Sequence, residues 1–158
     1  MSSSPPADRA DRADRAGFAF GVVLVVAGGL VAAATGPLEL VKGGWLAAYL
    51  VLVCGVAQCC LAVQDRLLVT TEPSAGRLQA SLLGWNAGNV LVIGGVLAAV
   101  PIVVDVGGIL LVAVLVVAAA AARHHASPLR AALYRVGFGV LIVSVPIGLT
   151  LAHLRAVR

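Results

Sequence analysis

Three amide side chains are the residues of this sequence best suited to binding chemistry. Asn86 and Asn89 are three positions apart, and Gln58 lies in an earlier apolar stretch. Each amide group carries donors and an acceptor that need partners in hydrocarbon. At about 1.5 Å per helical residue, Gln58 and Asn86 lie at similar depth, so the two amides can meet. We expect them either to fix helix register or to line a polar intramembrane pocket, to which Ser144 would add a hydroxyl.

Cysteine and histidine are the other residues that could carry chemistry. Cys54, Cys59 and Cys60 lie in one apolar run without CxxC spacing, so we expect small apolar side chains, with a redox or metal role as the alternative. His124 and His125 follow the fourth apolar run, whereas His153 ends the last one. They are expected a membrane thickness apart, which excludes a bis-histidine haem site within one chain. We therefore predict no cofactor, no metal and no catalytic residue.

Composition places these residues in lipid. The chain has 158 residues, of which 61% are hydrophobic and 11% charged, with a mean hydropathy of +1.05. A water-soluble domain of this size needs more charged surface. The charges occupy the N-terminal segment, the gaps between apolar runs or the ends of those runs. The net charge of +4 therefore reports membrane orientation, and we expect no nucleic-acid partner.

The apolar runs predict one all-α domain over residues 17–158 with five transmembrane helices. These helices are expected at about 17–35, 44–64, 79–100, 106–122 and 132–154. Residues 1–16 contain three Ala-Asp-Arg repeats and are expected to form a disordered tail. The four-residue spacing of Asp and Arg leaves open a frayed helical lead-in, and cleavage of the first run as a signal peptide is a second alternative.

Glycine, proline and aspartate set the expected helix ends. Gly36 is expected as the left-handed cap of the first helix, followed by Pro37. Residues 101–105 are expected to form a tight turn, with Asp105 capping the fourth helix. Pro146 is expected to kink the fifth helix.

Small residues at four-residue spacing predict close helix packing. They are Gly17 and Gly21 in the first run, and Ala80, Gly84 and Gly88 in the third. Trp85, deep in the third run, should pack inside the bundle or face acyl chains. Residues 23–46 also resemble residues 90–110, since each segment has a Gly-Gly pair, a proline, an acid and another Gly-Gly pair. Both copies would begin on the same side of the membrane.

Orientation follows from the positive residues. With the N-terminus inside, eight Lys and Arg residues are cytoplasmic and three are external, which favours a cytoplasmic N-terminus.

The segments WNAGN (85–89) and SVPIGLTLAH (144–153) resemble small multi-pass membrane proteins of GC-rich, actinobacterial-type bacteria. This resemblance implies a membrane location and no particular activity. We expect a plasma-membrane protein, most simply a non-catalytic accessory or scaffold subunit, with lipid, further copies or other membrane subunits as partners. The alternatives are a small-molecule transporter or binder using Gln58, Asn86 and Asn89, and the anchor of an electron-transfer complex.

Overall fold

Every element in the described part of the chain is a helix. The computed structural model describes residues 6–68, 75–121 and 139. The elements are α1 (Pro6–Thr35), α2 (Gly43–Tyr49), the π-helix η1 (Leu50–Val56), α3 (Ala57–Leu68), α4 (Ala75–Ala98) and α5 (Pro101–Ala121). Apart from residue 139, the expected fifth span at 132–154, with Ser144 and Pro146, lies outside the described residues.

Four helical stretches are long and apolar enough to cross a membrane. They are Arg12–Thr35, Gly43–Val63, Gly76–Ala98 and Pro101–Ala120, each of at least 20 residues, with hydropathies between 1.4 and 2.8. About 20 apolar residues are sufficient to span the hydrocarbon core. The described part of the chain is therefore all-helical, and the protein is a multi-pass membrane protein.

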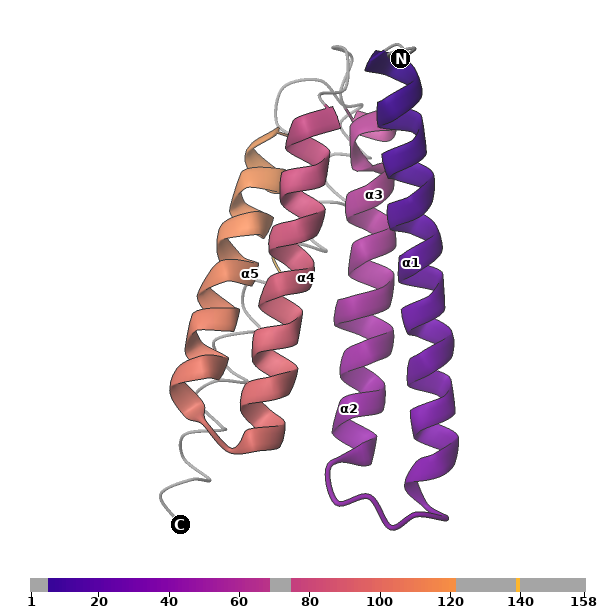
Figure 1. The fold of residues 1–158 in the computed structure, drawn as a ribbon, viewed down its shortest axis with the longest axis vertical. Helices are drawn as coiled ribbons and strands as arrows, with labels where there is room; N and C mark the ends of the chain where they lie inside the picture. Colours follow the sequence, from indigo (N-terminus) through magenta and orange to yellow (C-terminus); the bar gives the residue numbers. More distant parts are fainter. Residues whose placement is uncertain (1–5, 69–74, 122–138, 140–158) are drawn as a thin grey trace, which may run out of the picture. The chain divides into compact units, whose positions relative to one another are not determined.

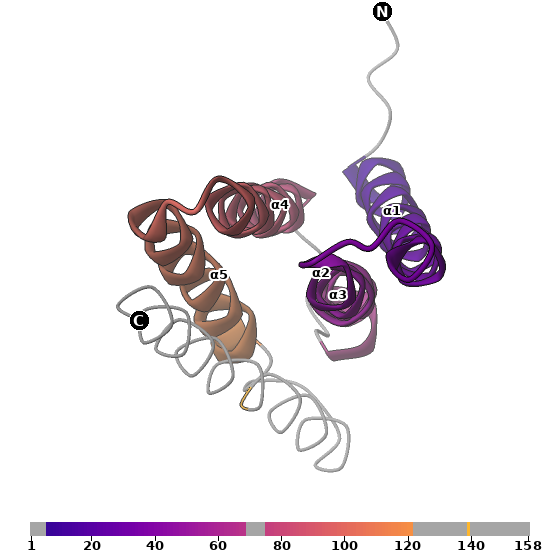
Figure 2. The same cartoon turned by 90° about the horizontal axis from the view of Figure 1, so that it is seen from below.

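The helices form two antiparallel hairpins, and the larger part of each hairpin falls in a different compact unit. Hairpin 1 consists of α1 and the continuous rod formed by α2, η1 and α3; residues 1–65 fall in the first unit, together with 72–82. Hairpin 2 consists of α4 and α5, and its residues from Leu83 onward fall in the second unit. Figures 1 and 2 show α1 beside the α2–α3 rod and α4 beside α5.

Helix α1 begins at Pro6, so the expected disordered tail is helical over residues 6–16. Proline is favoured at a first helical position, and the alanines and arginines of the repeats are strong helix formers. The helix propensity of the repeats thus extends the apolar helix toward the N-terminus. This agrees with the alternative prediction of a helical lead-in.

The second expected helix is not a uniform α-helix. Between α2 and α3 the seven residues of η1 form a π-helix, and the amide of Ala57 bonds to the carbonyl of Leu52, five residues earlier. The backbone stays helical on both sides, since Tyr49 and Ala57 have right-handed φ and ψ angles. Hydrophobic periodicity over 44–64 carries no sign of this wider turn.

Both hairpin turns close with a left-handed residue that is not glycine. In hairpin 1, Glu39 has φ 49°, and the amide of Leu40 bonds to the carbonyl of Thr35. In hairpin 2, Ala99 has φ 56°, and the amide of Val100 bonds to the carbonyl of Gly95. These six-to-one bonds are the Schellman pattern.

The expected caps at Gly36 and Asp105 are therefore wrong. No described glycine has a positive φ, so Gly36 is not left-handed. Asp105 is the fifth residue of α5, because that helix begins at Pro101 rather than near residue 106. A proline fits the first helical position, so the segment expected to be a turn is the first part of the helix.

The left-handed Ala99 yields a stability prediction. An L-residue in this conformation costs about 1–2 kcal/mol, which glycine avoids. Ala99→Gly should therefore raise the free energy of unfolding by about 1 kcal/mol. Ala98→Gly is the matched control, because Ala98 is also exposed but helical, and it should lower stability by about 1 kcal/mol. Thermal unfolding in detergent measures both; a loss in both variants would contradict the left-handed turn.

Candidate functional site

The two arms of hairpin 1 touch through their backbones at glycines. A Cβ atom on Gly21 would lie 2.9 Å from the carbonyl oxygen of Gly55, and one on Gly55 would lie 3.0 Å from that of Gly21. A Cβ on Gly28 would lie 2.9 Å from the oxygen of Ala47 and 3.0 Å from the nitrogen of Val51. Any larger residue at these positions would separate the helices.

Two neighbouring side chains of α3 reach the backbone of α1 at this contact. The amide Nε2 of Gln58 donates to the carbonyl oxygen of Gly17 at 3.4 Å. The thiol of Cys59 donates to the next carbonyl, that of Phe18, with Sγ at 3.6 Å. Gly17 permits this approach, since a Cβ there would lie 3.2 Å from the Cβ of Ala62. Gln58 and Cys59 therefore hold α3 against α1 at the depth where both backbones come close.

The other end of the Gln58 amide is an available acceptor. The side chain is 1% exposed, and Oε1 has no hydrogen-bond partner among the described residues. A buried acceptor without a partner costs about 1–3 kcal/mol. Gln58 therefore combines a packing role through Nε2 with an oxygen that can accept a hydrogen bond from another group.

Hairpin 2 is closed by glycines in the same manner. A Cβ on Gly88 would lie 3.2 Å from the carbonyl oxygen of Gly107, and one on Gly107 would lie 2.8 Å from that of Gly88. A Cβ on Gly95 would lie 2.8 Å from the nitrogen of Val104, and one on Gly84 would lie 3.0 Å from a methyl of Val114. Gly84 and Gly88 thus face α5.

A polar and aromatic face of α4 is also buried. Trp85 is 0% exposed and Asn89 is 3% exposed, four positions apart on one side of the helix. Asn86 is half-buried. The indole nitrogen of Trp85 is buried without a hydrogen-bond partner among the described residues. Trp85 is thus packed inside the protein, and the alternative that it faces acyl chains is wrong.

The predicted pocket is not brought together within either hairpin. Gln58 belongs to the first unit, whereas Asn86 and Asn89 belong to the second, so their meeting stays a prediction. Ser144 lies outside the described residues. Ala80, the first member of the predicted small-residue ridge, is exposed and belongs to the first unit.

Asp14 is a buried charged residue that sequence reasoning missed. It is 4% exposed and lies within the first candidate span, although the sequence pattern predicts a disordered tail there. The available signal was helical spacing, because Asp14 precedes Gly17 by three residues and shares its face of α1. A carboxylate therefore stands on the packed face of hairpin 1, at the end where α1 enters the span.

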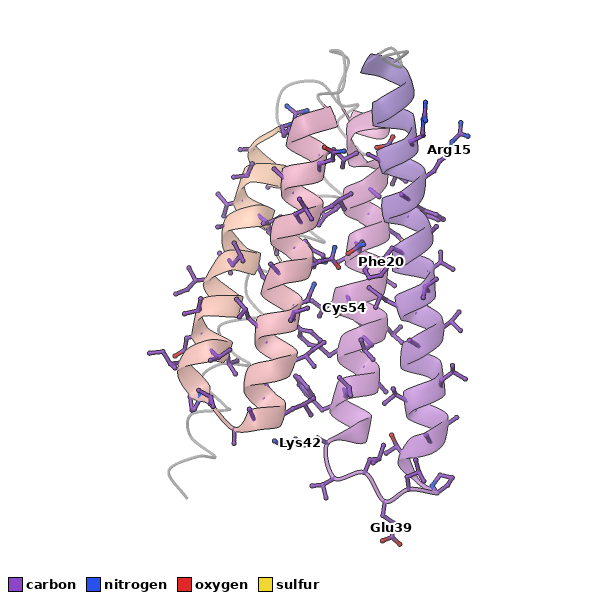
Figure 3. All side chains as sticks on the ribbon, viewed as in Figure 1. Arg15, Phe20, Glu39, Lys42 and Cys54 are labelled. Carbon is purple, nitrogen blue, oxygen red and sulfur yellow. The ribbon has the colours of Figure 1, made fainter. Side chains whose placement is uncertain are left out.

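The cysteines lie along the rod of α2, η1 and α3, where Cys59 also donates to the carbonyl of Phe18. All three are free, and Cys54 is buried midway along the rod (Figure 3). Cys59 and Cys60 are half-buried. Among the residues searched, no three His, Cys, Asp or Glu side chains gather into a possible metal site. His124, His125 and His153 lie outside the described residues.

Adjacent glycines on α1 test the backbone contact. Gly28→Ala places a methyl group 2.6 Å from a methyl of Val51 and should lower the free energy of unfolding by about 1–3 kcal/mol. Gly29→Ala meets no described atom within 4 Å and should raise it by up to about 1 kcal/mol through helix propensity. Gly95→Ala and Gly94→Ala are the corresponding pair in hairpin 2. Thermal unfolding should separate the members of each pair; equal effects would refute the contact.

Comparisons with protein-family models, with curated proteins and with solved structures found no match for this chain.

Proposed function

We propose that this protein is a non-catalytic accessory or scaffold subunit of a bacterial plasma membrane, with five spans and a cytoplasmic N-terminus. The observation that carries the proposal is the backbone-to-backbone closure of both hairpins at glycines. Close packing of small residues stabilises helix pairs in lipid, where hydrophobic burial between helices gives little. Such hairpins are suited to presenting a fixed surface to neighbouring membrane components.

The outer surface of the hairpins supports this role. Large aliphatic side chains are exposed along the helices, among them Val23, Val26, Leu30, Leu83 and Val90. Acyl chains or apolar faces of other membrane helices would cover these residues.

Gly29 on α1 and Gly94 on α4 remain open on this outer surface, as does Gly44 at the start of α2. Gly17, Gly21, Gly84 and Gly88 contact the opposite arm of their own hairpin or, in the case of Gly17, Leu82 as well. A Cβ on Gly29 or Gly94 would meet no described atom within 4 Å. Association through a small-residue face is therefore assigned to Gly29 and Gly94 rather than to the glycines first predicted.

The proposed orientation is supported by the charges at the two ends of hairpin 1. Figure 3 shows Arg15 near one end and Glu39 and Lys42 at the opposite end. The arginine-rich start of α1 favours the cytoplasmic side. Trp45 stacks on Tyr49, with ring centroids 5.2 Å apart, and this aromatic pair follows Lys42 as expected of an interfacial belt at the outer side.

Enlarging the open glycines tests the scaffold role. The double variant Gly29→Leu/Gly94→Leu should associate at least about tenfold more weakly than the parent. A loss of about 1.4 kcal/mol of packing energy changes the dissociation constant by a factor of ten. Its unfolding temperature should stay close to that of the parent. Native mass spectrometry of protein extracted in lipid nanodiscs measures the bound subunits. Val90→Leu, at a position that is 69% exposed, is the control and should associate normally. A parent protein that is monomeric and without bound subunits would overturn the proposal.

A second candidate function, binding of a small molecule, is favoured by the free acceptor of Gln58. Gln58→Met keeps the length of the side chain but removes both the bond to Gly17 and the buried acceptor. Since an intramembrane hydrogen bond is worth about 0.6 kcal/mol and an unsatisfied acceptor costs about 1–3 kcal/mol, stability should be unchanged or higher. A screen of polar metabolites by thermal shift would support binding if parent-specific stabilisation disappears in the variant. Retained subunit association with no such stabilisation would favour the scaffold role.

A further inference from the structure

The glycines that close the two hairpins have the same spacing. In α1 they are Gly17, Gly21 and Gly28, and in α4 they are Gly84, Gly88 and Gly95. The second set follows the first by 67 positions at each glycine. Phe18 and Trp85, both aromatic, are also 67 positions apart.

The atoms that these glycines meet also correspond. Gly21 meets the carbonyl of Gly55 and the side chain of Cys59, whereas Gly88 meets the carbonyl of Gly107 and the side chain of Leu111. The reverse contacts agree as well. A Cβ on Gly55 would lie 3.0 Å from the nitrogen of Val25, and one on Gly107 would lie 2.8 Å from the nitrogen of Val92, again 67 positions later.

The correspondence continues on both sides of this crossing. Gly28 meets the carbonyl of Ala47 and the nitrogen and a methyl of Val51, as Gly95 meets the carbonyl of Val100 and the same groups of Val104. At the other side, Gly17 meets Ala62 and Gly84 meets Val114. Equivalent contacts therefore extend from Gly17 to Gly28 on α1 and from Gly84 to Gly95 on α4, with an additional contact of Gly17 to Leu82.

The returning arms differ by one residue, and the difference falls inside η1. From Val51 to Gly55 there are four steps along the chain, but from Val104 to Gly107 there are three. A π-helix bonds residue i to i+5, so it holds one more residue per hydrogen-bonded turn than an α-helix. The interval from Val51 to Gly55 lies within Leu50–Val56, whereas the corresponding part of α5 is α-helical.

The two hairpin turns also match, but the turn of hairpin 1 lies further from the glycine contacts. Thr35 occupies the place in the first Schellman turn that Gly95 occupies in the second. Because Gly28 is the contact equivalent of Gly95, hairpin 1 continues for seven more residues before its turn. Seven residues are nearly two helical turns, so the added length preserves the facing surfaces of the arms.

We infer that the two hairpins are copies of one two-helix unit, and that η1 accommodates a single residue inserted into hairpin 1 between two fixed glycine contacts. In this register residues 23 and 90 begin together as the sequence similarity predicts, but the Gly-Gly pairs are shifted by one residue, and Gly55 rather than Gly43 or Gly44 corresponds to Gly107. Both hairpins then start on the same membrane side, as in a parallel repeat.

Removing one residue from each returning arm tests the inference in the full-length protein. Deleting Leu52 should convert η1 to a regular α-helix and keep both glycine contacts, so the unfolding temperature should change by less than about 3 °C. Deleting Val106 leaves no π-helix to absorb the change, and the residues beyond it rotate by about 100° relative to Gly88. That variant should lose about 10 °C or more, or yield no monodisperse protein. The two sites are matched, because Leu52 is 59% exposed and Val106 is 52% exposed.

Two further variants keep the outcome unambiguous. Deleting Cys54 instead of Leu52 gives the same number of residues between Val51 and Gly55. The two deletions should therefore change the unfolding temperature equally. Adding Gly28→Ala to the Leu52 deletion should still lower the unfolding temperature as it does in the parent, because the contact with Val51 is retained. Equal damage from deleting Leu52 and Val106, or loss of the Gly28→Ala effect in the deletion background, would overturn the inference.

Discussion

Close approach of two helix backbones is the constraint on which each hairpin depends. At Gly21 and Gly55, and again at Gly88 and Gly107, any side chain would enter the space occupied by the opposite backbone. In lipid, separating the helices would leave the arms with little to attract them, because acyl chains are as apolar as the side chains. The absence of four Cβ atoms therefore determines how closely the arms of each hairpin approach, and Gln58 and Cys59 can reach the carbonyls of α1 only at that separation.

Hydropathy identified the four described spans because lipid restricts the possible structures. A backbone in hydrocarbon must satisfy its own hydrogen bonds, so a long apolar run is necessarily helical. The helix ends follow other rules, and those predictions were less accurate. Pro6 and Pro101 begin helices where apolar patterning placed a tail and a turn. Glu39 and Ala99 take the left-handed positions because the hydrogen bonds of the turn, rather than the nearest glycine, determine which residue closes it.

Only part of the candidate site could be derived from local spacing. The pairs Gly17–Gly21 and Gly84–Gly88 are recognisable because four positions bring residues onto one helix face. Gly28 and Gly95 lie seven positions further on, and their partners are distant in the sequence, so pattern alone gives no reason to choose Gly28 over the adjacent Gly29. Asp14 was missed because the apolar run begins after it. The helix and its packed face begin earlier and include Asp14. The π-helix could not be predicted from a short window of sequence. Its extra residue is evident only when the returning arms of the two hairpins are compared.

The correspondence between the hairpins shows where they have diverged. By the contacts of the shared crossing, Gln58 and Cys59 in hairpin 1 correspond to Leu110 and Leu111 in hairpin 2. Conversely, Asn86 and Asn89 on α4 correspond to Ala19 and Val22 on α1. The polar groups thus occupy the returning arm of one hairpin and the outgoing arm of the other, while the glycine contacts are common to both. A buried amide costs free energy unless it has a partner. Replacing an aliphatic residue by an amide therefore has a larger energetic consequence than exchanging one aliphatic residue for another. The shared glycines account for the architecture, and the functional difference between the hairpins is to be sought at Gln58, Asn86 and Asn89.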